Sequence, residues 1–175
     1  MVISSIQREI EHAKAGKPAR IIAKMNSLIE TSVIEALYAA SAAGVQIDLI
    51  VRGMCSLRPE VPGLSDNIRV RSIVGRQLEH ARVYYFYNDG AEDTYISSAD
   101  WMERNFFRRI ETCTPIEDPV IKARVIYEGL TLALQDNQQA WLMQGDGSYV
   151  RATPTDGEPI VNLQLDLLEK YSHQG

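Results

Sequence analysis

The stretch that decides the fold is RIIAKMNSLIETSVIEALYAASAAGVQIDLIVRG, residues 20–53. Apolar runs at 19–24 and 45–51 predict two short buried strands, and the pattern from Ser32 to Ala43 predicts a helix between them. A strand, a helix and a strand within roughly thirty residues form a βαβ unit, which gives two parallel strands joined by a right-handed crossover.

The ends of these elements carry signals of their own. Ser32 with Glu35 fits a capping box at the start of the helix, and Gly44 fits a C-cap at its end. Ligands of open α/β sheets collect outside the carboxyl ends of the strands. We therefore expect the residues that follow the two strands to border a binding site: Lys24 and Asn26 after the first, Arg52 and Gly53 after the second.

The rest of the chain predicts further helices and strands around this unit. We expect a packing helix at 3–15, a loop at 54–67, strands at 68–73, 80–87, 94–98 and 109–114, a helix at 119–133, a hairpin at 141–151 and a helix at 161–171. The strands at 80–87 and 94–98 should pair as a hairpin. The expected fold is one α/β domain over residues 1–175, a mixed sheet flanked by helices with the βαβ unit near its N-terminus.

Composition favours a soluble protein. Of the 175 residues 45% are hydrophobic, which suffices for a core, and no apolar run approaches the roughly 20 residues of a membrane span. The first residues lack the basic region and apolar core of a signal peptide, so we expect a cytoplasmic location. Cys55 and Cys113 are far apart and neither belongs to a CxxC pair, so we expect two buried, reduced thiols and neither a zinc site nor a disulfide.

The net charge of -5 argues against bulk nucleic-acid binding, yet cations gather in the middle of the chain. From Arg52 to Arg109 there are nine Arg, no Lys and eight acidic residues. The planar guanidinium makes paired hydrogen bonds to phosphate and stays charged, so arginines without lysines suggest phosphate binding. Ordinary surface ion pairing is the alternative for most of them.

His80 is the one histidine placed for acid-base chemistry, since His12 lies on a peripheral helix and His173 near the end of the sequence. In a strand, alternation would put His80 and Arg82 on the same face. A histidine that only makes a hydrogen bond within the sheet is the competing interpretation.

Common nucleotide-loop, dinucleotide, zinc-protease and hydrolase motifs are missing, so side chains would have to hold any phosphate. Asp100 and Glu103 could bind magnesium in principle, but two loop carboxylates are more often solvated. We assign no metal ligand.

Several long strings resemble polyphosphate kinase in its C-terminal portion: IDLIVRG, LRPEVPGLS, IRVRSIVGR, LEHAR and SSADWM, within residues 20–115. The resemblance implies a phospholipase-D-like fold, in which two similar domains each supply one histidine motif, and this chain resembles the second. His80-Ala81-Arg82 then stands in the place of an HxK element, with Arg82 replacing the lysine and Tyr87 an aspartate. Ser97 to Asp100 stands near a GSxN element.

By this resemblance Arg52 contacts nucleotide phosphates, and His80 contacts ATP and acts as the general acid or base. Further phosphate-binding candidates are Arg82, Lys24, Asn26, Ser98 and Asp100. The resemblance also implies ATP, ADP and polyphosphate as substrates, Mg²⁺ bound elsewhere, a homo-oligomer, and a phosphohistidine in a preceding domain without which this fragment is inactive.

Two alternatives stay open. One is a phosphodiesterase or nuclease half-site that dimerises to pair two copies of His80. The other is a non-catalytic module that binds polyanions through its arginines: Arg52, Arg69, Arg71, Arg76, Arg82, Arg108 and Arg109. Asn105 is a weaker site candidate.

Overall fold

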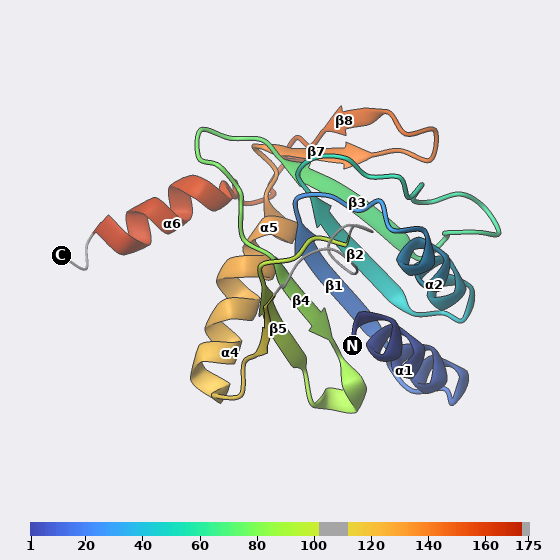
Figure 1. Cartoon of the computed structure of the whole chain (residues 1–175). Helices are drawn as coiled ribbons and strands as arrows, with labels where there is room; N and C mark the ends of the chain where they lie inside the picture. Colours follow the sequence, from blue (N-terminus) through green and yellow to red (C-terminus); the bar gives the residue numbers. More distant parts are fainter. Residues whose placement is uncertain (102–111, 173–175) are drawn as a thin grey trace.

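The computed structural model describes residues 1–101 and 112–172 and contains an eight-stranded mixed sheet with the strand order β6-β5-β4-β1-β2-β3-β7-β8 (Figure 1). At its centre, β1 (Arg20–Met25), β2 (Gln46–Val51) and β3 (Ile68–Ile73) run parallel. The helix α2 (Thr31–Ala42) connects β1 to β2. The predicted βαβ unit and the mixed α/β fold are therefore confirmed.

The start of α2 differs from the prediction. Glu30 is the N-cap, without a side-chain capping bond, and the Ser32 hydroxyl donates to the Glu30 carboxylate at 2.9 Å. Because Ser32 lies inside the first turn and uses its hydroxyl there, the Ser32–Glu35 capping box was wrong. Gly44 follows the helix with a φ of +97°, a left-handed conformation that favours glycine, as predicted.

Antiparallel strands flank the parallel centre on both sides. On one side lie β4 (Val83–Phe86), β5 (Asp93–Ser97) and β6 (Cys113–Pro115), and on the other β7 (Ala140–Met143) and β8 (Tyr149–Arg151). The short turn η1 (Asn88–Gly90) joins β4 to β5, so both predicted hairpins are confirmed. Of the strand expected at 109–114, residues 109–111 lie outside the described part of the chain.

Helices cover both faces of the sheet (Figure 1). On one face, α1 (Val2–Lys14) and α2 pack on a core that includes Ile21, Leu49 and Phe86. On the other face, α4 (Pro119–Ile126), a π-helical turn η2 (Tyr127–Thr131) and α5 (Leu132–Gln135) pack on a second core around Ile50 and Val83. The last helix, α6 (Leu163–Ser172), points away from the sheet in Figure 1.

The strand expected at 80–87 is shorter than predicted. β4 begins at Val83, which pairs with Lys24 on β1 and with Ile96 on β5. Before Val83 the ladder continues only through the Arg82 carbonyl, which accepts from the Ser97 amide at 3.1 Å, because β1 ends at Met25, and residues 80–82 are not part of a strand. His80 and Arg82 are therefore not on one face of a strand, and that prediction was wrong.

Two smaller expectations also change. The helix expected at 119–133 contains the π turn, where a side chain on Gly129 would come within 3.3 Å of Val83. Cys55 is half-buried but Cys113 is exposed, so the expectation of two buried thiols was wrong for Cys113; both are free.

Across the described residues, each helix is too short or too polar to cross a bilayer.

Candidate functional site

The candidate site forms where several chain segments meet at the carboxyl edge of the parallel strands. Residues after β1 and β2 emerge there, and so do the residues before β4 and after β5, because these two strands run in alternate directions beside β1. Isolated bridges from Leu28 to Cys55 and to Trp101 tie the loops together. The topology thus collects at one edge the residues that the sequence predicted.

Arg52 follows β2 directly and is half-buried. Its Nη1 is buried and has no hydrogen-bond partner within the described part of the chain. The Arg52 carbonyl accepts a bond of 3.3 Å from the Ser72 hydroxyl, which fixes the backbone. A buried donor without an acceptor is costly, so this guanidinium is suited to an anionic ligand.

Lys24 is the last residue but one of β1 and is only 5% exposed. Its Nζ lies 2.6 Å from Oε2 of Glu79, the residue before His80. This ammonium therefore already has a carboxylate partner, and direct contact with a phosphate would require the pair to open.

Arg82 and Asp100 form a second buried ion pair. Arg82 donates from Nε to Oδ1 of Asp100 at 2.9 Å and from Nη2 to Oδ2 at 3.3 Å. The Asn26 backbone amide also donates to Asp100 at 2.7 Å. With its amide oxygen toward Arg82, the Asn26 side chain accepts from Nη2 at 2.6 Å and donates to the Glu79 carbonyl at 3.0 Å. Asn26, Arg82 and Asp100 thus join the end of β1 to the segment before β4 and to the loop after β5.

His80 is exposed, between these two ion pairs. Its carbonyl accepts a bond of 3.3 Å from Arg82 Nη1. The backbone of His80 is thus held through the side chains of its neighbours, while the imidazole faces solvent, as a group that meets a substrate must.

Ser97 and Ser98 shape the turn that leads to Asp100. The Ser97 hydroxyl accepts from the Ala99 amide at 3.0 Å, and the Tyr84 hydroxyl donates to the Ala99 carbonyl. Burial raises the pKa of Tyr84 well above its ordinary value, so this phenol stays a donor. Ser98 is exposed and its Oγ accepts from the Thr112 amide at 2.9 Å. Glu103, Asn105, Arg108 and Arg109 lie outside the described residues.

Two contributors were missed from the sequence: Glu79 and Gln164. Glu79 has a signal, its place beside His80 in LEHAR, whereas Gln164 lies 85 residues further along and carries no motif. Its amide nitrogen donates to Glu79 Oε1 at 2.9 Å.

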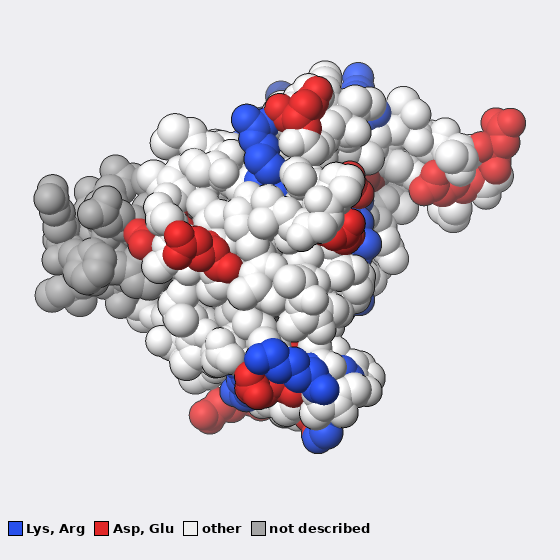
Figure 2. Space-filling model, turned by 90° about the vertical axis from the view of Figure 1, so that its right-hand side faces the viewer, with Lys and Arg blue, Asp and Glu red and all other residues white. Residues whose placement is uncertain are grey.

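Other arginines form ion pairs away from this edge. Arg69 and Arg20 both pair with the Asp48 carboxylate, at 2.9 and 3.1 Å. On the face shown in Figure 2, blue and red groups are scattered over a largely uncharged surface, several of them side by side, without a continuous basic stripe.

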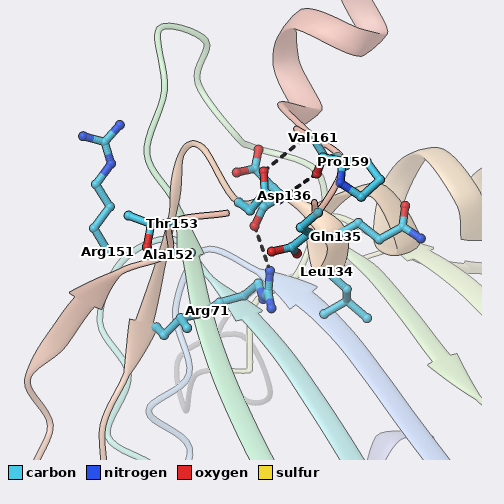
Figure 3. A pocket seen from close by; sticks show the side chains of 12 residues that line it. Arg71, Leu134, Gln135, Asp136, Arg151, Ala152, Thr153, Pro159 and Val161 are labelled. Carbon is cyan, nitrogen blue, oxygen red and sulfur yellow. Dashed lines mark hydrogen bonds between the residues drawn. The ribbon is translucent and has the colours of Figure 1, made fainter. Parts of the chain in front are cut away.

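Arg71 lines a separate pocket of about 740 Å³ near the start of α6 (Figure 3). Its Nη1 donates to the Ala133 and Asp136 carbonyls at 3.2 Å, and burial lowers its pKa. Arg151 lines the same pocket, but so do the carboxylates of Asp136 and Glu158, so the lining charges balance. This arrangement does not favour the polyanion-binding alternative.

Among residues 1–101 and 112–172 there is no group of three or more His, Cys, Asp or Glu side chains that could hold a metal ion. The Asp100 carboxylate is occupied by Arg82 and Asn26. The described residues do not fit a magnesium site, and no step of the chemistry below is assigned to one.

Comparison with known proteins identifies the family. The family model described as polyphosphate kinase C-terminal domain 2 matches residues 1–164. The chain belongs to the polyphosphate kinase family. A polyphosphate kinase from Neisseria meningitidis serogroup B is 76% identical over 167 residues, and one from Burkholderia ambifaria is 61% identical over 170.

Among solved structures, the crystal structure of polyphosphate kinase from Porphyromonas gingivalis superposes with a TM-score of 0.93 at 42% identity and covers 99% of this chain. That match covers 26% of the Porphyromonas protein. The Neisseria and Burkholderia alignments cover 95% and 97% of this chain but 24% of each relative. The chain therefore corresponds to the C-terminal quarter of polyphosphate kinases.

Proposed function

We propose that this C-terminal domain contributes the ATP-binding and acid-base residues of a polyphosphate kinase. The reaction is reversible transfer of the ATP γ-phosphate to polyphosphate, through a phosphohistidine supplied by the preceding domain. In the first step the bond between the γ-phosphorus and ADP breaks as an N–P bond to the imidazole forms. In the second step that N–P bond breaks as the phosphorus bonds to the terminal oxygen of the polyphosphate chain.

The observation that carries this proposal is Arg52, whose buried Nη1 has no acceptor among residues 1–101 and 112–172, at the edge where His80 is exposed. A phosphate oxygen would satisfy this donor and the positive charge together. Phosphoryl transfer depends mainly on positioning and on stabilising charge on the oxygens, which a guanidinium does well. His80 then serves as the general acid or base opposite the phosphorylated histidine.

The surrounding residues support these two. Arg82, Lys24 and Asn26 are already bonded to Asp100 and Glu79, so in this proposal they hold the loops and reach phosphate only when those bonds open. Asp100 is anionic and acts through Arg82. Ser98 is exposed, and because its hydroxyl donates to the Thr112 carbonyl at 3.4 Å, it reaches a phosphate oxygen only when that bond opens.

The proposed function also includes a metal ion, an assembly and a location. Mg²⁺ accompanies ATP with ligands outside this chain, and the complete enzyme is a homo-oligomer. A cytoplasmic location agrees with the use of ATP. Nucleic acid is not a partner, because the net charge is -5.

The test uses a chimera in which this chain replaces the corresponding C-terminal quarter of the Neisseria meningitidis relative. Radiolabelled ATP reports polyphosphate synthesis by the chimera, by its His80→Ala and Arg52→Ala variants, and by the 175-residue chain alone. We expect an active chimera, losses of roughly a hundredfold or more in both variants, and no synthesis by the chain alone.

Full activity of His80→Ala would overturn the assigned role of His80. Synthesis by the chain alone would overturn its dependence on another domain. Hydrolysis of a simple phosphodiester by the chain alone, lost in His80→Ala, would replace the proposal by the nuclease half-site.

A further inference from the structure

The segment that carries His80 has little regular structure of its own. Residues 74–82, between β3 and β4, form neither helix nor strand. Backbone groups in such a segment need other partners, and its conformation depends on them. Its far end is held by the pair of Arg82 with Asp100, and its near end by a side chain from α6.

That side chain is Gln164, which is 6% exposed. Its amide pairs with the backbone of Gln77 as a neighbouring strand would: Oε1 accepts from the Gln77 amide at 2.8 Å, and Nε2 donates to the Gln77 carbonyl at 2.8 Å. The same Nε2 donates to Glu79 Oε1 at 2.9 Å. One side chain thus fixes the backbone of Gln77, through its amide and its carbonyl, and the Glu79 carboxylate next to His80.

Glycine at position 75 leaves room for this contact. A Cβ on Gly75 would lie 2.3 Å from Gln164 Oε1 and 2.3 Å from Gln139 Oε1, closer than any ordinary contact. An alanine there would displace the tips of both glutamines, and so push the Gln164 amide away from Gln77 without altering Gln164 itself.

The start of α6 is itself anchored, so Gln164 is held from behind. The Leu163 amide donates to Asp136 Oδ2 at 2.8 Å, and the Leu163 side chain is 1% exposed. Asn137 bonds to the Pro159 carbonyl and the Val161 amide, both at 2.9 Å, just before the helix (Figure 3). The amide of Gln164 therefore reaches the His80 segment from a rigid base.

We infer that Gln164 is a positioning residue for phosphotransfer: through Gln77 and Glu79 it sets the place of the His80 imidazole. This inference rests on the proposed function of His80. It gives α6 a part in the reaction through its contacts with the His80 segment.

A double-mutant cycle in the chimera tests the inference. Gln164→Met keeps the length of the side chain but loses both hydrogen-bonding groups, and Leu165→Ala, at a residue 60% exposed on the same helix, is the control. Gln164→Met should lower the rate of synthesis roughly tenfold when His80 is present, because small misplacements of a reacting group are costly. It should lower the residual rate of His80→Ala by less than about twofold, since a displaced imidazole matters only where one exists.

Gly75→Ala provides a second route to the same displacement and should give the same pattern. Hydrogen exchange should rise in residues 74–82 of both variants and stay unchanged in β1, which shows that the sheet is folded.

The outcomes separate the two proposals. If His80→Ala loses activity while Gln164→Met and Gly75→Ala lower the rate equally with and without His80, or do not lower it, the positioning role is overturned and the proposed function stands. If His80→Ala keeps full activity, the proposed function fails and the inference fails with it.

Discussion

Lys24 Nζ and Glu79 Oε2 lie 2.6 Å apart, and their side chains are only 6% and 15% exposed. This pair joins the central strand β1 to the residue before His80. A buried charge is tolerable only with its partner present, so each residue of the pair depends on the other.

Lys24→Met should destabilise the chain strongly because the Glu79 carboxylate then keeps its burial but loses its cation. We expect a loss of about 3–5 kcal/mol in the free energy of unfolding, measured with urea. The control is Lys17→Met, which breaks a pair with Asp89 of the same length, 2.6 Å, but with side chains 47% and 50% exposed. That change should alter the free energy of unfolding little, because both side chains are solvated. Equal losses in the two variants would contradict the importance of burial here.

Arg82→Lys should also be destabilising, although it keeps the charge. Lysine has one ammonium group and cannot make the two separate bonds that Arg82 makes to the Asp100 oxygens. We expect a loss of about 1–3 kcal/mol in urea unfolding. Arg124→Lys, at a side chain 59% exposed, is the matched control and should change stability little. A stability of Arg82→Lys equal to the parent's would show that the paired geometry does not matter.

The two thiols should react at different rates. Burial raises the pKa of both, but Cys113 is exposed whereas Cys55 is half-buried with Sγ 3.6 Å from the Leu57 carbonyl. A neutral disulfide reagent at pH 8 should label Cys113 first, and both rates should still rise above the ordinary thiol pKa of about 8.5 because thiolate is the reacting form. Cys113→Ser should remove the fast phase and Cys55→Ser should keep it. A fast phase that survives Cys113→Ser would refute this order.

Glu128, on η2, should make the stability of the contact between η2 and α6 depend on pH. Burial raises the pKa of Glu128, but hydrogen bonds from Lys170, Tyr171 and Arg124 outweigh it, so the net pKa is lowered. The charged form therefore stabilises the fold above the ordinary glutamate pKa of about 4.3, and this contribution is lost as the pH falls through the lower folded-state value.

The measurement is the difference in urea unfolding between the parent and Glu128→Gln from pH 7 to pH 3. It should be clear at pH 7 and shrink toward pH 3, while Glu169→Gln, an exposed change on α6, should show a smaller difference at pH 7. A Glu128→Gln difference that does not change with pH would exclude the ionised carboxylate as its cause.

The central part of the fold could be predicted because its signals are local. The apolar runs before Lys24 and Arg52 and the helical pattern between them specify the βαβ unit, and the rule about strand ends then places Arg52 at the site. The prediction for His80 and Arg82 was wrong because alternation describes side chains within a strand but does not show where the strand begins. β1 ends at Met25, and before Val83 only the Arg82 carbonyl bonds to a neighbouring strand, at Ser97. Val83 is the first residue of that segment with a ladder partner on β1.

The contacts that hold His80 could not be predicted from local pattern. Gln77 and Gln164 are 87 positions apart, and a glutamine at the start of an amphipathic helix is normally solvated. Gln164 belongs to no motif, and Gly75 lies in the string IRVRSIVGR, which gives no sign of a contact with Gln164. What joins them is the docking of α6, which depends on Asp136 and Leu163 and becomes visible only in three dimensions.

The link from Gln164 to Gln77 also has a consequence for synthesis on the ribosome. Translation produces the His80 segment well before α6. In a nascent chain the backbone of Gln77 and the Glu79 carboxylate therefore have no bond to Gln164 until 85 or more further residues have been made. The parallel strands can assemble first, but the histidine segment becomes ordered only after the exit tunnel has released α6. A product cut short before Gln164 would fold much of its sheet and still lack the contacts that order the His80 segment.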